Sequence, residues 1–563
     1  MTKTTKIIIA CAVAAVAIVL GSEIFKTVRF RILCESTEGM NTRIDTVLTV
    51  GTQARRGDIV DCKGNVLATI DTVYGVYFDT TVPKDSLWQE ALPVLSGGLA
   101  EILGDRTPAE YFAYLTDGRT KGKKFIKICK NVGQSTLDSL KGLPLFNLSM
   151  YKGGVIIETM QKRVYPYGPL ARRTIGFARS NNELYNNNIG IEGFFNKALS
   201  GTDGYEVIKD RYARLPFGKV RHIRKTLEKV ESANGERVRI VMDIKMQAVA
   251  DSLLRAAIKG HKEIKGACLV TVSTNSGAIR TMVNLTRDVR GDIGEYYNIS
   301  IGYGYEPGRI IAPATALAAS KCDSTLSLDG LDLISKDVLA DMAGKCYPPA
   351  YCDTLKELLN AGYTLDHIEL EGLEGLKMIT PENNSWRDSY LSSIANGYCI
   401  MAPAFQWLNL YTGIARGGDA IAQRLVGTLR SADGKRILND PIMVFVPDEY
   451  SICTKGQADA LTSSLKRASA KHLSGTAYEM AGLFGTSFIT HPNGGYADEQ
   501  GRRAVQSSYA GFFPADRPAF SIICMVYMDF AADSRSASAI TKKVVRDFVG
   551  SDIVAARVKE TFE

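Results

Sequence analysis

Residues 266–279 read Gly-Ala-Cys-Leu-Val-Thr-Val-Ser-Thr-Asn-Ser-Gly-Ala-Ile, and they decide the fold of the second half of the chain. Two apolar runs, 267–272 and 278–283, flank the turn-forming residues 274–277, which is the pattern of a β-hairpin. A similar pair of runs, 508–513 and 520–528, flanks the loop 514–518 near the carboxyl end. A long region with helical periodicity separates the two hairpins. This order predicts an α+β fold, in which one antiparallel sheet is flanked by helices.

A helix is predicted directly before the first hairpin. Residues 238–242 alternate as a strand, and Asp243 can cap the helix that follows. Gly260 predicts the end of this helix. Its apolar positions recur at helical spacing and are Met246, Val249, Ala250, Leu253, Leu254 and Ala257. A further helix, from about 537 to 549, is predicted to close the chain.

The amino-terminal half has a different pattern. Residues 56–61 run into 63–68 as a strand, a Gly-Asn turn and a second strand. The Asn-rich stretch 181–188 is typical of an exposed loop. A boundary is predicted near residue 235, where the Ser-Ala-Asn-Gly sequence 232–235 follows a charged run.

Length and composition favour a folded protein of at least two domains. The chain has 563 residues, of which 45% are hydrophobic and 23% charged. Its net charge of +8 is spread along the sequence, without a basic block interleaved with aromatic residues. This distribution argues against nucleic acid as a partner.

The amino terminus contains an apolar run, from Ile7 to Leu20, preceded by Lys3 and Lys6. The run is shorter than the ~20 residues of a full membrane span, although it can be extended through Phe25. A cleaved signal peptide and a lipoprotein signal ending at Cys11 are the alternatives. We favour an uncleaved signal anchor, because the small-residue cleavage pattern lies inside the run instead of after it.

The cysteines and histidines give no support to a metal site or a cofactor. The eleven cysteines form no Cys-x-x-Cys pair, and the five histidines are isolated. A local disulfide between Cys346 and Cys352 is one alternative. The favoured interpretation is that the cysteines are buried as small apolar side chains.

Ordered motifs along the chain resemble those of the class B penicillin-binding proteins, the membrane-anchored transpeptidases of bacterial cell-wall synthesis. In the first half, the hairpin at 56–68, the segment 163–171 and the element 190–204 are similar to family motifs. Cys62 stands where the family usually has an Arg. The positions that carry the resemblance in this half are Arg56, Gly57, Asp61, Gly64, Arg163, Tyr165, Pro166, Gly168, Gly190, Glu192 and Gly201.

The second half resembles the transpeptidase domain of that family. The matching segments include the hairpin at 266–279, the Tyr305-Glu306-Pro307-Gly308 sequence, Asn396-Gly397-Tyr398 and the stretch 481–486. The resemblance implies three parts: a cytoplasmic tail and membrane anchor at 1–28, an amino-terminal dimerisation-like or pedestal domain at 29–235, and a transpeptidase-like domain at 236–563.

The catalytic positions of this family are substituted. Acyl transfer in the family needs a Ser at the start of a helix and a Lys one turn later, which takes the hydroxyl proton. Arg309 and Ala312 stand at these two positions. An Arg side chain stays protonated and a methyl group cannot titrate, so neither replaces the lost groups.

The other two catalytic motifs are also altered. The family's Lys-Thr-Gly triplet, whose cation and hydroxyl hold the substrate carboxylate, is replaced here by Leu483, Phe484 and Gly485, followed by Thr486. We expect this apolar pair not to bind a carboxylate, and Phe484 to fill the groove. No Ser-x-Asn triplet lies between Arg309 and Gly482, and the helical stretch 354–362 offers only Asn360.

Two local patterns imitate the lost motifs. Ser463 and Lys466 satisfy Ser-x-x-Lys, but they lie just before residues 481–486, which is the wrong order for the family. The triplet at 273–275 satisfies Ser-x-Asn but precedes Tyr305, and it is better explained as a turn.

The leading functional interpretation is a catalytically inactive homologue that acts as a scaffold or regulator of peptidoglycan synthesis in cell division or elongation. The resemblance implies a single-pass protein of the inner membrane, with most of the chain in the periplasm. It also implies partners among polytopic glycosyltransferases or division and elongation scaffolds. The alternatives are an active D,D-transpeptidase that uses relocated residues such as Ser463 and Lys466, and a non-covalent binder of peptidoglycan stem peptides.

Overall fold

The computed structural model describes residues 28–33, 45–177, 189–214, 220–331, 335–363, 370, 372, 374–439, 451–490, 495–529 and 534–563. The predicted membrane anchor lies outside the described residues. Within the described part of the chain, no helix is both long enough and apolar enough to cross a membrane.

Contacts divide the described chain into two compact units. The first unit comprises the described residues up to Arg56 together with 68–165 and 202–234, and the second comprises 57–67, 166–201 and 235–563. Residues 57–67 and 166–201 therefore lie in the second unit, whereas a single predicted boundary near residue 235 assigns them to the amino-terminal domain. Backbone bonds explain the difference, because Gly57 N donates to Leu199 O and Glu236 N donates to Ala198 O.

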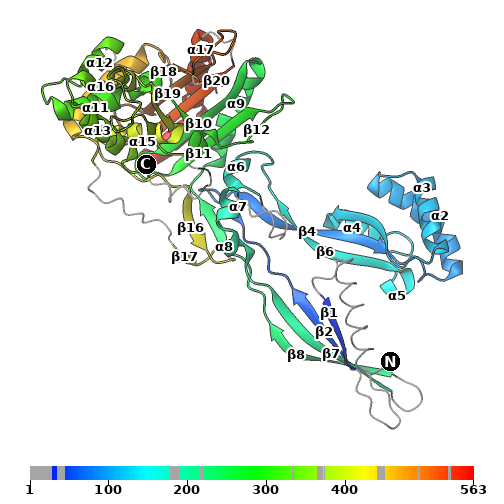
Figure 1. The fold of residues 1–563 in the computed structure, drawn as a ribbon. Helices are drawn as coiled ribbons and strands as arrows, with labels where there is room; N and C mark the ends of the chain where they lie inside the picture. The colour runs from blue at the N-terminus through cyan, green and yellow to red at the C-terminus, as the bar shows by residue number, and fades with distance from the viewer. Residues whose placement is uncertain are drawn as a thin grey trace. The chain divides into compact units, whose positions relative to one another are not determined.

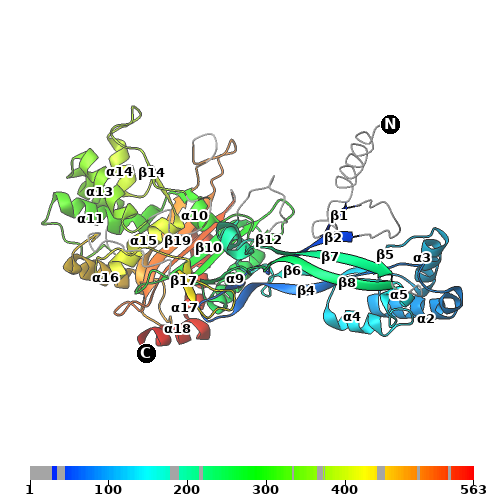
Figure 2. The ribbon, with the colours of Figure 1, turned by 90° about the horizontal axis from the view of Figure 1, so that it is seen from below.

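The first unit contains an antiparallel sheet with the strand order β1–β2–β7–β8 and a smaller α/β part. In the smaller part, β4 pairs with β5 and β6, and the helices gather around these strands (Figure 2). Its core includes Phe78, Leu95 and Leu115, none of which is exposed. The elements of this unit are β1 (Val28–Leu33), β2 (Asp45–Thr52), β4 (Val66–Phe78, which begins in the second unit), α2 (Asp85–Leu103), α3 (Pro108–Thr120), β5 (Ile126–Val132), α4 (Gln134–Lys141), α5 (Met150–Gly153), β6 (Val155–Val164), β7 (Gly204–Arg214) and β8 (Val220–Val230).

The second unit is built on a six-stranded antiparallel sheet with the order β12–β11–β10–β20–β19–β18 (Figure 1). Its strands are β10 (Ile264–Ser273), β11 (Ile279–Arg287), β12 (Ile293–Gly294), β18 (Ala481–Phe488), β19 (Val505–Phe513) and β20 (Phe520–Met528). Both predicted hairpins are confirmed, as β10–β11 and β19–β20, and they join where β10 pairs with β20. The prediction of one antiparallel sheet flanked by helices is therefore correct.

The remaining elements of the second unit are shorter strands and the helices. These are β3 (Ile59–Val60), α6 (Arg172–Ile175), α7 (Gly190–Phe194), α8 (Asn196–Ser200), β9 (Arg237–Ile240), α9 (Ile244–Gly260), α10 (Ile299–Gly302), β13 (Gly304–Tyr305), η2 (Gly308–Ile311), α11 (Ala312–Cys322), α12 (Lys336–Gly344), α13 (Pro348–Asn360), β14 (Lys377–Met378), α14 (Ser389–Ala395), β15 (Ile400–Pro403), α15 (Ala404–Ala415), β16 (Val426–Arg430), β17 (Ile437–Asn439), α16 (Lys455–Ala470), α17 (Ser534–Val549) and α18 (Asp552–Phe562).

Helices cover both faces of the large sheet. On one face, α9 and α17 pack against apolar side chains such as Ile522 and Cys524 of β20. On the other face, Thr412 of α15 shares a hydrogen bond with Ser521 of β20 at 2.6 Å. Because neighbouring strand residues point to opposite faces, these contacts place α9 and α17 on one side of the sheet and α15 on the other.

The helix predictions are largely confirmed. The side chain of Asp243 accepts hydrogen bonds from Lys245 N and Met246 N at the start of α9, and the helix ends at Gly260. The carboxyl-terminal helix is found as α17, but it does not close the chain, because Ser551 caps a further helix, α18. Residues 550–551 are Gly and Ser, a helix stop and a helix cap, and the prediction of one closing helix did not use this signal.

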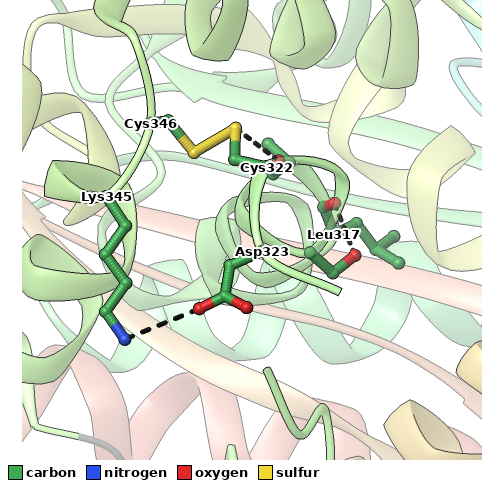
Figure 3. The surroundings of a disulfide bond; sticks show 7 residues. Leu317, Cys322, Asp323, Lys345 and Cys346 are labelled. Atoms are coloured by element: carbon green, nitrogen blue, oxygen red, sulfur yellow. Dashed lines mark hydrogen bonds and ion pairs between the residues drawn. A yellow bond between two sulfur atoms is a disulfide. The ribbon is translucent and has the colours of Figure 1, made fainter. Parts of the chain in front are cut away.

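A disulfide joins Cys322, at the end of α11, to Cys346, just after α12 (Figure 3). The alternative pair in the sequence, Cys346 with Cys352, is wrong, since Cys352 is a buried free thiol within α13. Spacing alone could not choose between these partners, because the choice depends on how α11 and α12 fold back on each other.

We expect reduction of this disulfide to destabilise the second unit. The bond spans 24 residues, and closing a loop of this size contributes about 3 kcal/mol to the free energy of unfolding. Urea unfolding with and without dithiothreitol measures this difference. The double variant Cys322→Ser/Cys346→Ser should be insensitive to dithiothreitol, and equal stability of the oxidised and reduced wild-type protein would contradict the prediction.

Candidate functional site

The predicted site begins where η2 passes into α11. Gly308 has φ +56°, and a Cβ placed there would lie 2.7 Å from Thr486 O of β18. Gly485 is equally constrained, since its Cβ would lie 2.5 Å from Pro307 O. These glycines let the start of the helix lie directly against the edge strand of the sheet, as the motif resemblance implies.

Arg309 stands where the motif resemblance implies the family's nucleophile. Its guanidinium Nη2 donates a hydrogen bond to Leu331 O at 3.1 Å. Ala312, at the second position, is 1% exposed and begins α11. The pair therefore presents a permanent cation and a buried methyl group, and neither can accept a proton from a nucleophile.

The loop that accepts this hydrogen bond is held by α16. Ser464 Oγ accepts hydrogen bonds from Gly330 N at 2.7 Å and from Leu331 N at 3.3 Å. Arg467 forms an ion pair with Asp329 in the same loop. The sequence did not indicate these residues, because turn-forming residues in a loop and a serine within a helix have no motif that links them.

Strand β18 presents different residues on its two faces. Ser487 Oγ donates to Glu306 O at 2.6 Å, and Gly485 contacts Pro307, so the odd-numbered residues face η2. Leu483 shares this face and is 3% exposed. Leu483, which the motif resemblance aligns with a family lysine, therefore presents an apolar side chain on the face toward η2.

Phe484 lies on the opposite face. Its ring is 4.6 Å from the ring of Tyr509 and 5.6 Å from that of His472, and it packs against the core shared with α9 and α17. The expectation that Phe484 fills the groove is wrong. The alternation of a strand separates Leu483 from Phe484, and the sequence alone did not show which of the two faces η2.

Positive charge surrounds the end of α16 near this site. Burial lowers the pKa of His472, and Lys542, Lys471 and Arg309 lower it further. Lys542 Nζ lies 3.2 Å from His472 Nδ1. Burial and the cationic neighbours both favour the neutral imidazole.

Glu306 has a structural role beside η2. Its carboxylate accepts hydrogen bonds from Tyr496 Oη at 2.8 Å and from Cys399 N at 2.8 Å, and burial raises its pKa. Gly397 has φ +81°, and a Cβ there would lie 2.3 Å from Gly308 O. Glu306 and Gly397 therefore hold the segment after α14 against the start of η2.

The alternative nucleophile and base are engaged elsewhere. Ser463 Oγ donates to Asp459 O at 3.0 Å within α16. Lys466 Nζ forms ion pairs with Glu479 at 2.5 Å and Asp516 at 3.1 Å, and these carboxylates raise its pKa. These ion pairs stabilise the protonated form of Lys466 and disfavour a role as the base for Ser463. Asn360, the nearest remnant of a Ser-x-Asn motif, accepts a hydrogen bond from Gln406 Nε2 at 2.7 Å.

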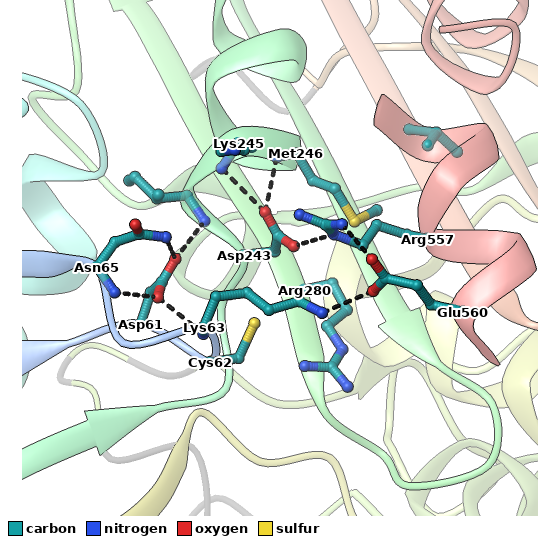
Figure 4. A network of polar contacts seen from close by, with 12 residues as sticks. Asp61, Cys62, Lys63, Asn65, Asp243, Lys245, Met246, Arg280, Arg557 and Glu560 are labelled. Atoms are coloured by element: carbon teal, nitrogen blue, oxygen red, sulfur yellow. Dashed lines mark hydrogen bonds and ion pairs between the residues drawn. The ribbon is translucent and has the colours of Figure 1, made fainter. Parts of the chain in front are cut away.

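The amino-terminal motif residues shape the second unit. Asp61 is fully buried, and its carboxylate accepts hydrogen bonds from Lys63 N, Asn65 N and Asn65 Nδ2 at 2.8–2.9 Å and from Ile244 N at 3.3 Å (Figure 4). Gly64 has φ +89° in the turn between. Asp61 therefore ties this turn to the start of α9.

The glycines among the other motif positions serve the backbone. Gly57 and Gly190 allow close approach, since a Cβ would lie 1.8 Å from Glu236 O in the first case and 2.6 Å from Thr174 O in the second. Glu192 is 1% exposed. Gly168 and Gly201 have positive φ. The structure places the rest of the motif positions as follows: Arg56 before β3, Arg163 near the end of β6, Tyr165 and Pro166 after β6, and Tyr305 in β13.

Comparison with known proteins agrees with this architecture. The family model described as the penicillin-binding protein dimerisation domain matches residues 51–240. The chain is 22% identical over 519 residues to a peptidoglycan D,D-transpeptidase FtsI from Buchnera aphidicola, covering 84% of this chain and 82% of that protein. It is 24% identical over 238 residues to a probable peptidoglycan D,D-transpeptidase FtsI from Caulobacter vibrioides, covering 42% of this chain and 31% of that protein.

Solved structures share the fold. Penicillin-binding protein 2X from Streptococcus thermophilus aligns with a TM-score of 0.65 at 16% identity, covering 91% of this chain and 82% of that one. The penicillin-binding protein of a Helicobacter pylori complex between PBP2 and MreC aligns with a TM-score of 0.59 at 15% identity, covering 92% and 99%. With the dimerisation domain, the homologous transpeptidases and the ordered motifs together, the chain is a member of the class B penicillin-binding proteins.

Proposed function

We propose that this chain is a catalytically inactive class B penicillin-binding protein that acts as a scaffold or regulator in peptidoglycan synthesis. One observation carries the proposal. Arg309 stands at the start of the helix where the family places its nucleophile, and its guanidinium is bonded to Leu331 O. Ala312 and Leu483 supply no amine at the two positions where the family places lysines.

The absence of a nucleophile has a large effect on the rate of acyl transfer. Removing a nucleophile from an acyl-transfer site eliminates the covalent route and leaves only positioning and electrostatic effects, a loss of about 10⁶-fold in the best-studied serine hydrolase. Three separate losses at Arg309, Ala312 and Leu483 cannot be offset by Ser463 and Lys466, because these are bonded to Asp459, Glu479 and Asp516. The alternative of an active enzyme with relocated residues is therefore disfavoured.

A stem-peptide binder is also disfavoured at this site. The family holds the substrate carboxylate with a cation and a hydroxyl, and Leu483 is apolar and 3% exposed. Phe484, in the hydroxyl position, points to the opposite face and packs with Tyr509. A carboxylate at the former site would therefore lose its usual partners.

The scaffold role would use the parts that the chain retains. The dimerisation domain is present, and in Helicobacter pylori a penicillin-binding protein of this fold forms a complex with MreC. We infer partners of the same kind here: a polytopic glycosyltransferase or a division or elongation scaffold of the inner membrane. The apolar run 7–20 would anchor the chain there, and the Cys322–Cys346 disulfide favours an oxidising compartment such as the periplasm for the second unit.

Complementation of a deletion strain separates scaffolding from catalysis. The expected result is that Arg309→Ala restores normal cell shape as well as the wild-type chain does, because no step depends on residue 309 for chemistry. A chain that lacks residues 1–60 should fail to restore it and should lose its co-purifying membrane partners. Normal shape in the deletion strain itself, or full rescue by the truncated chain, would contradict the proposal.

A further inference from the structure

A cavity of about 310 Å³ lies within the second unit, away from Arg309. Its walls come from five parts of the chain: the turn after β3, the start of α9, the β10–β11 hairpin, the start of β20 and helix α18. Figure 4 shows residues from the turn, α9, the hairpin and α18. The residues that matter for its chemistry are Cys62, Lys63, Ser273, Arg280, Arg557 and Glu560. This volume is at the small end of the range for small-molecule sites, roughly 300–1,000 Å³.

Most charges at the cavity are already paired. Arg557 bonds to Asp243 at 2.5 Å and to Glu560 at 2.7 Å. Lys63 pairs with the second oxygen of Glu560 at 2.6 Å. The carboxylates of Asp243 and Glu560 are therefore neutralised by neighbouring cations (Figure 4).

Arg280 is different. Its Nη1 donates to Val241 O at 3.0 Å, and within the described residues no carboxylate forms an ion pair with it. The guanidinium is always charged and has five N–H donors, so most of its hydrogen-bonding capacity is not used by this one contact. The cavity thus contains one cation that lacks a counter-charge from the described residues.

Ser273 adds a second polar side chain to the wall of the cavity. The residue is 5% exposed and lines the same cavity. Within the described residues its hydroxyl forms no hydrogen bond, and it can both donate and accept one. A ligand oxygen in the cavity would satisfy it.

Cys62 leaves room for such a ligand. Its side chain stands where the family usually has an Arg, and it lines the cavity beside Lys63. A thiol fills much less space than a guanidinium on a three-carbon stem and brings no competing positive charge. The space at this position is therefore a property of this chain.

We propose that this cavity is a binding site for a small carboxylate-bearing molecule, held by the guanidinium of Arg280 and the hydroxyl of Ser273, with the Cys62 thiol in its wall. A planar guanidinium pairs with a carboxylate through two parallel hydrogen bonds, which gives both affinity and orientation. The site is separate from the substituted catalytic positions, so it stands whether or not the scaffold role is correct.

Alkylation of Cys62 in the full-length chain tests the site. Iodoacetate and iodoacetamide modify Cys62 by the same chemical step. The thiol proton goes to solvent, the thiolate displaces iodide, and a carbon–sulfur bond forms. Only iodoacetate carries a carboxylate for Arg280. Peptide mass spectrometry gives the rate ratio of the two reagents at Cys62 and at Cys129, a partly exposed free thiol of the first unit.

The expected ratio of iodoacetate to iodoacetamide rates is about tenfold higher at Cys62 than at Cys129, which corresponds to about 1.4 kcal/mol of docking energy. Arg280→Gln should reduce it to the value at Cys129, and the matched control Arg290→Gln, on the exposed β11–β12 turn, should leave it unchanged. Burial raises the pKa of Cys62 and slows both reagents alike, so the ratio is unaffected.

A second measurement covers the case in which Arg280→Gln fails to fold. In the wild-type chain, acetate at constant ionic strength should slow the reaction of iodoacetamide with Cys62, while chloride should not. Equal ratios at Cys62 and Cys129, with no protection by acetate, would overturn the proposal and leave a cavity that holds only water.

Discussion

Asp61→Ala is expected to lower the free energy of unfolding of the second unit by about 3–5 kcal/mol, among the largest effects of any single substitution. The side chain is 0% exposed, and its two oxygens accept hydrogen bonds from three backbone N–H groups and the Asn65 amide. Alanine leaves these donors without an acceptor in a buried turn. Urea unfolding followed by circular dichroism measures the loss.

Asp61→Asn provides a graded comparison. Its carbonyl oxygen can keep the bonds from Lys63 N and Asn65 N, but its amide cannot accept those from Asn65 Nδ2 and Ile244 N, so about half of the loss is expected. Asp71→Ala, at an exposed position of β4, should change stability by less than about 0.5 kcal/mol. Equal effects at Asp61 and Asp71 would show that the turn does not depend on this carboxylate.

Glu295→Gln is expected to remove a large pH dependence of stability. Burial raises the pKa of Glu295 to about 8 from an ordinary value near 4.5, although backbone N–H donors from Arg173 and Asn284 oppose the shift. The nearby charges are Asp251, which raises the pKa, and Arg255, which lowers it.

The direction follows from proton counts. Between pH 4.5 and 8 the folded state keeps a proton that the unfolded state has lost, so stability falls as pH rises. The contribution of protonated Glu295 to the free energy of unfolding is fully present below about pH 4.5 and is lost once the pH has passed about 8. We expect the wild-type chain to lose about 2–4 kcal/mol across this window, at about 1.4 kcal/mol per pKa unit as an upper limit.

Urea unfolding at pH 5 and pH 8 measures this loss. The Gln variant should show a flatter profile and be more stable than the wild-type chain at pH 8. Glu382→Gln, at an exposed position, should leave the wild-type slope intact. An unchanged slope in Glu295→Gln would mean that other groups produce the pH dependence.

The sequence predicted the architecture of the second unit well, because its signals are local. Alternating apolar runs around residues 274–277 gave the β10–β11 hairpin, and Asp243 followed by apolar residues at helical spacing gave α9. Patterns of period 2 and 3.6 reflect burial of one face, which does not depend on distant partners. The motif positions around Gly308 were found in another way, through their resemblance to the motifs of the class B penicillin-binding proteins.

Features that depend on distant partners were missed. Three contacts join segments that only the folded chain brings together: the disulfide between Cys322 and Cys346, the ion pair between Arg557 and Asp243, and the hydrogen bond from Arg309 to Leu331 O. The direction of Phe484 was wrong because strand alternation gives relative faces but does not identify which face meets η2. The helix α18 was missed because the Gly550-Ser551 break after α17 was not taken as the end of one helix and the start of another.

The most direct test of the central claim is acylation by a penicillin. The detergent-solubilised full-length chain is incubated with a fluorescent penicillin beside an active class B protein, and intact mass spectrometry follows the adduct. The account predicts labelling of the active protein and no adduct on this chain, with its circular dichroism showing a folded protein. An adduct that maps to Ser463 and disappears in Ser463→Ala would contradict the account and make this chain an enzyme with a displaced nucleophile.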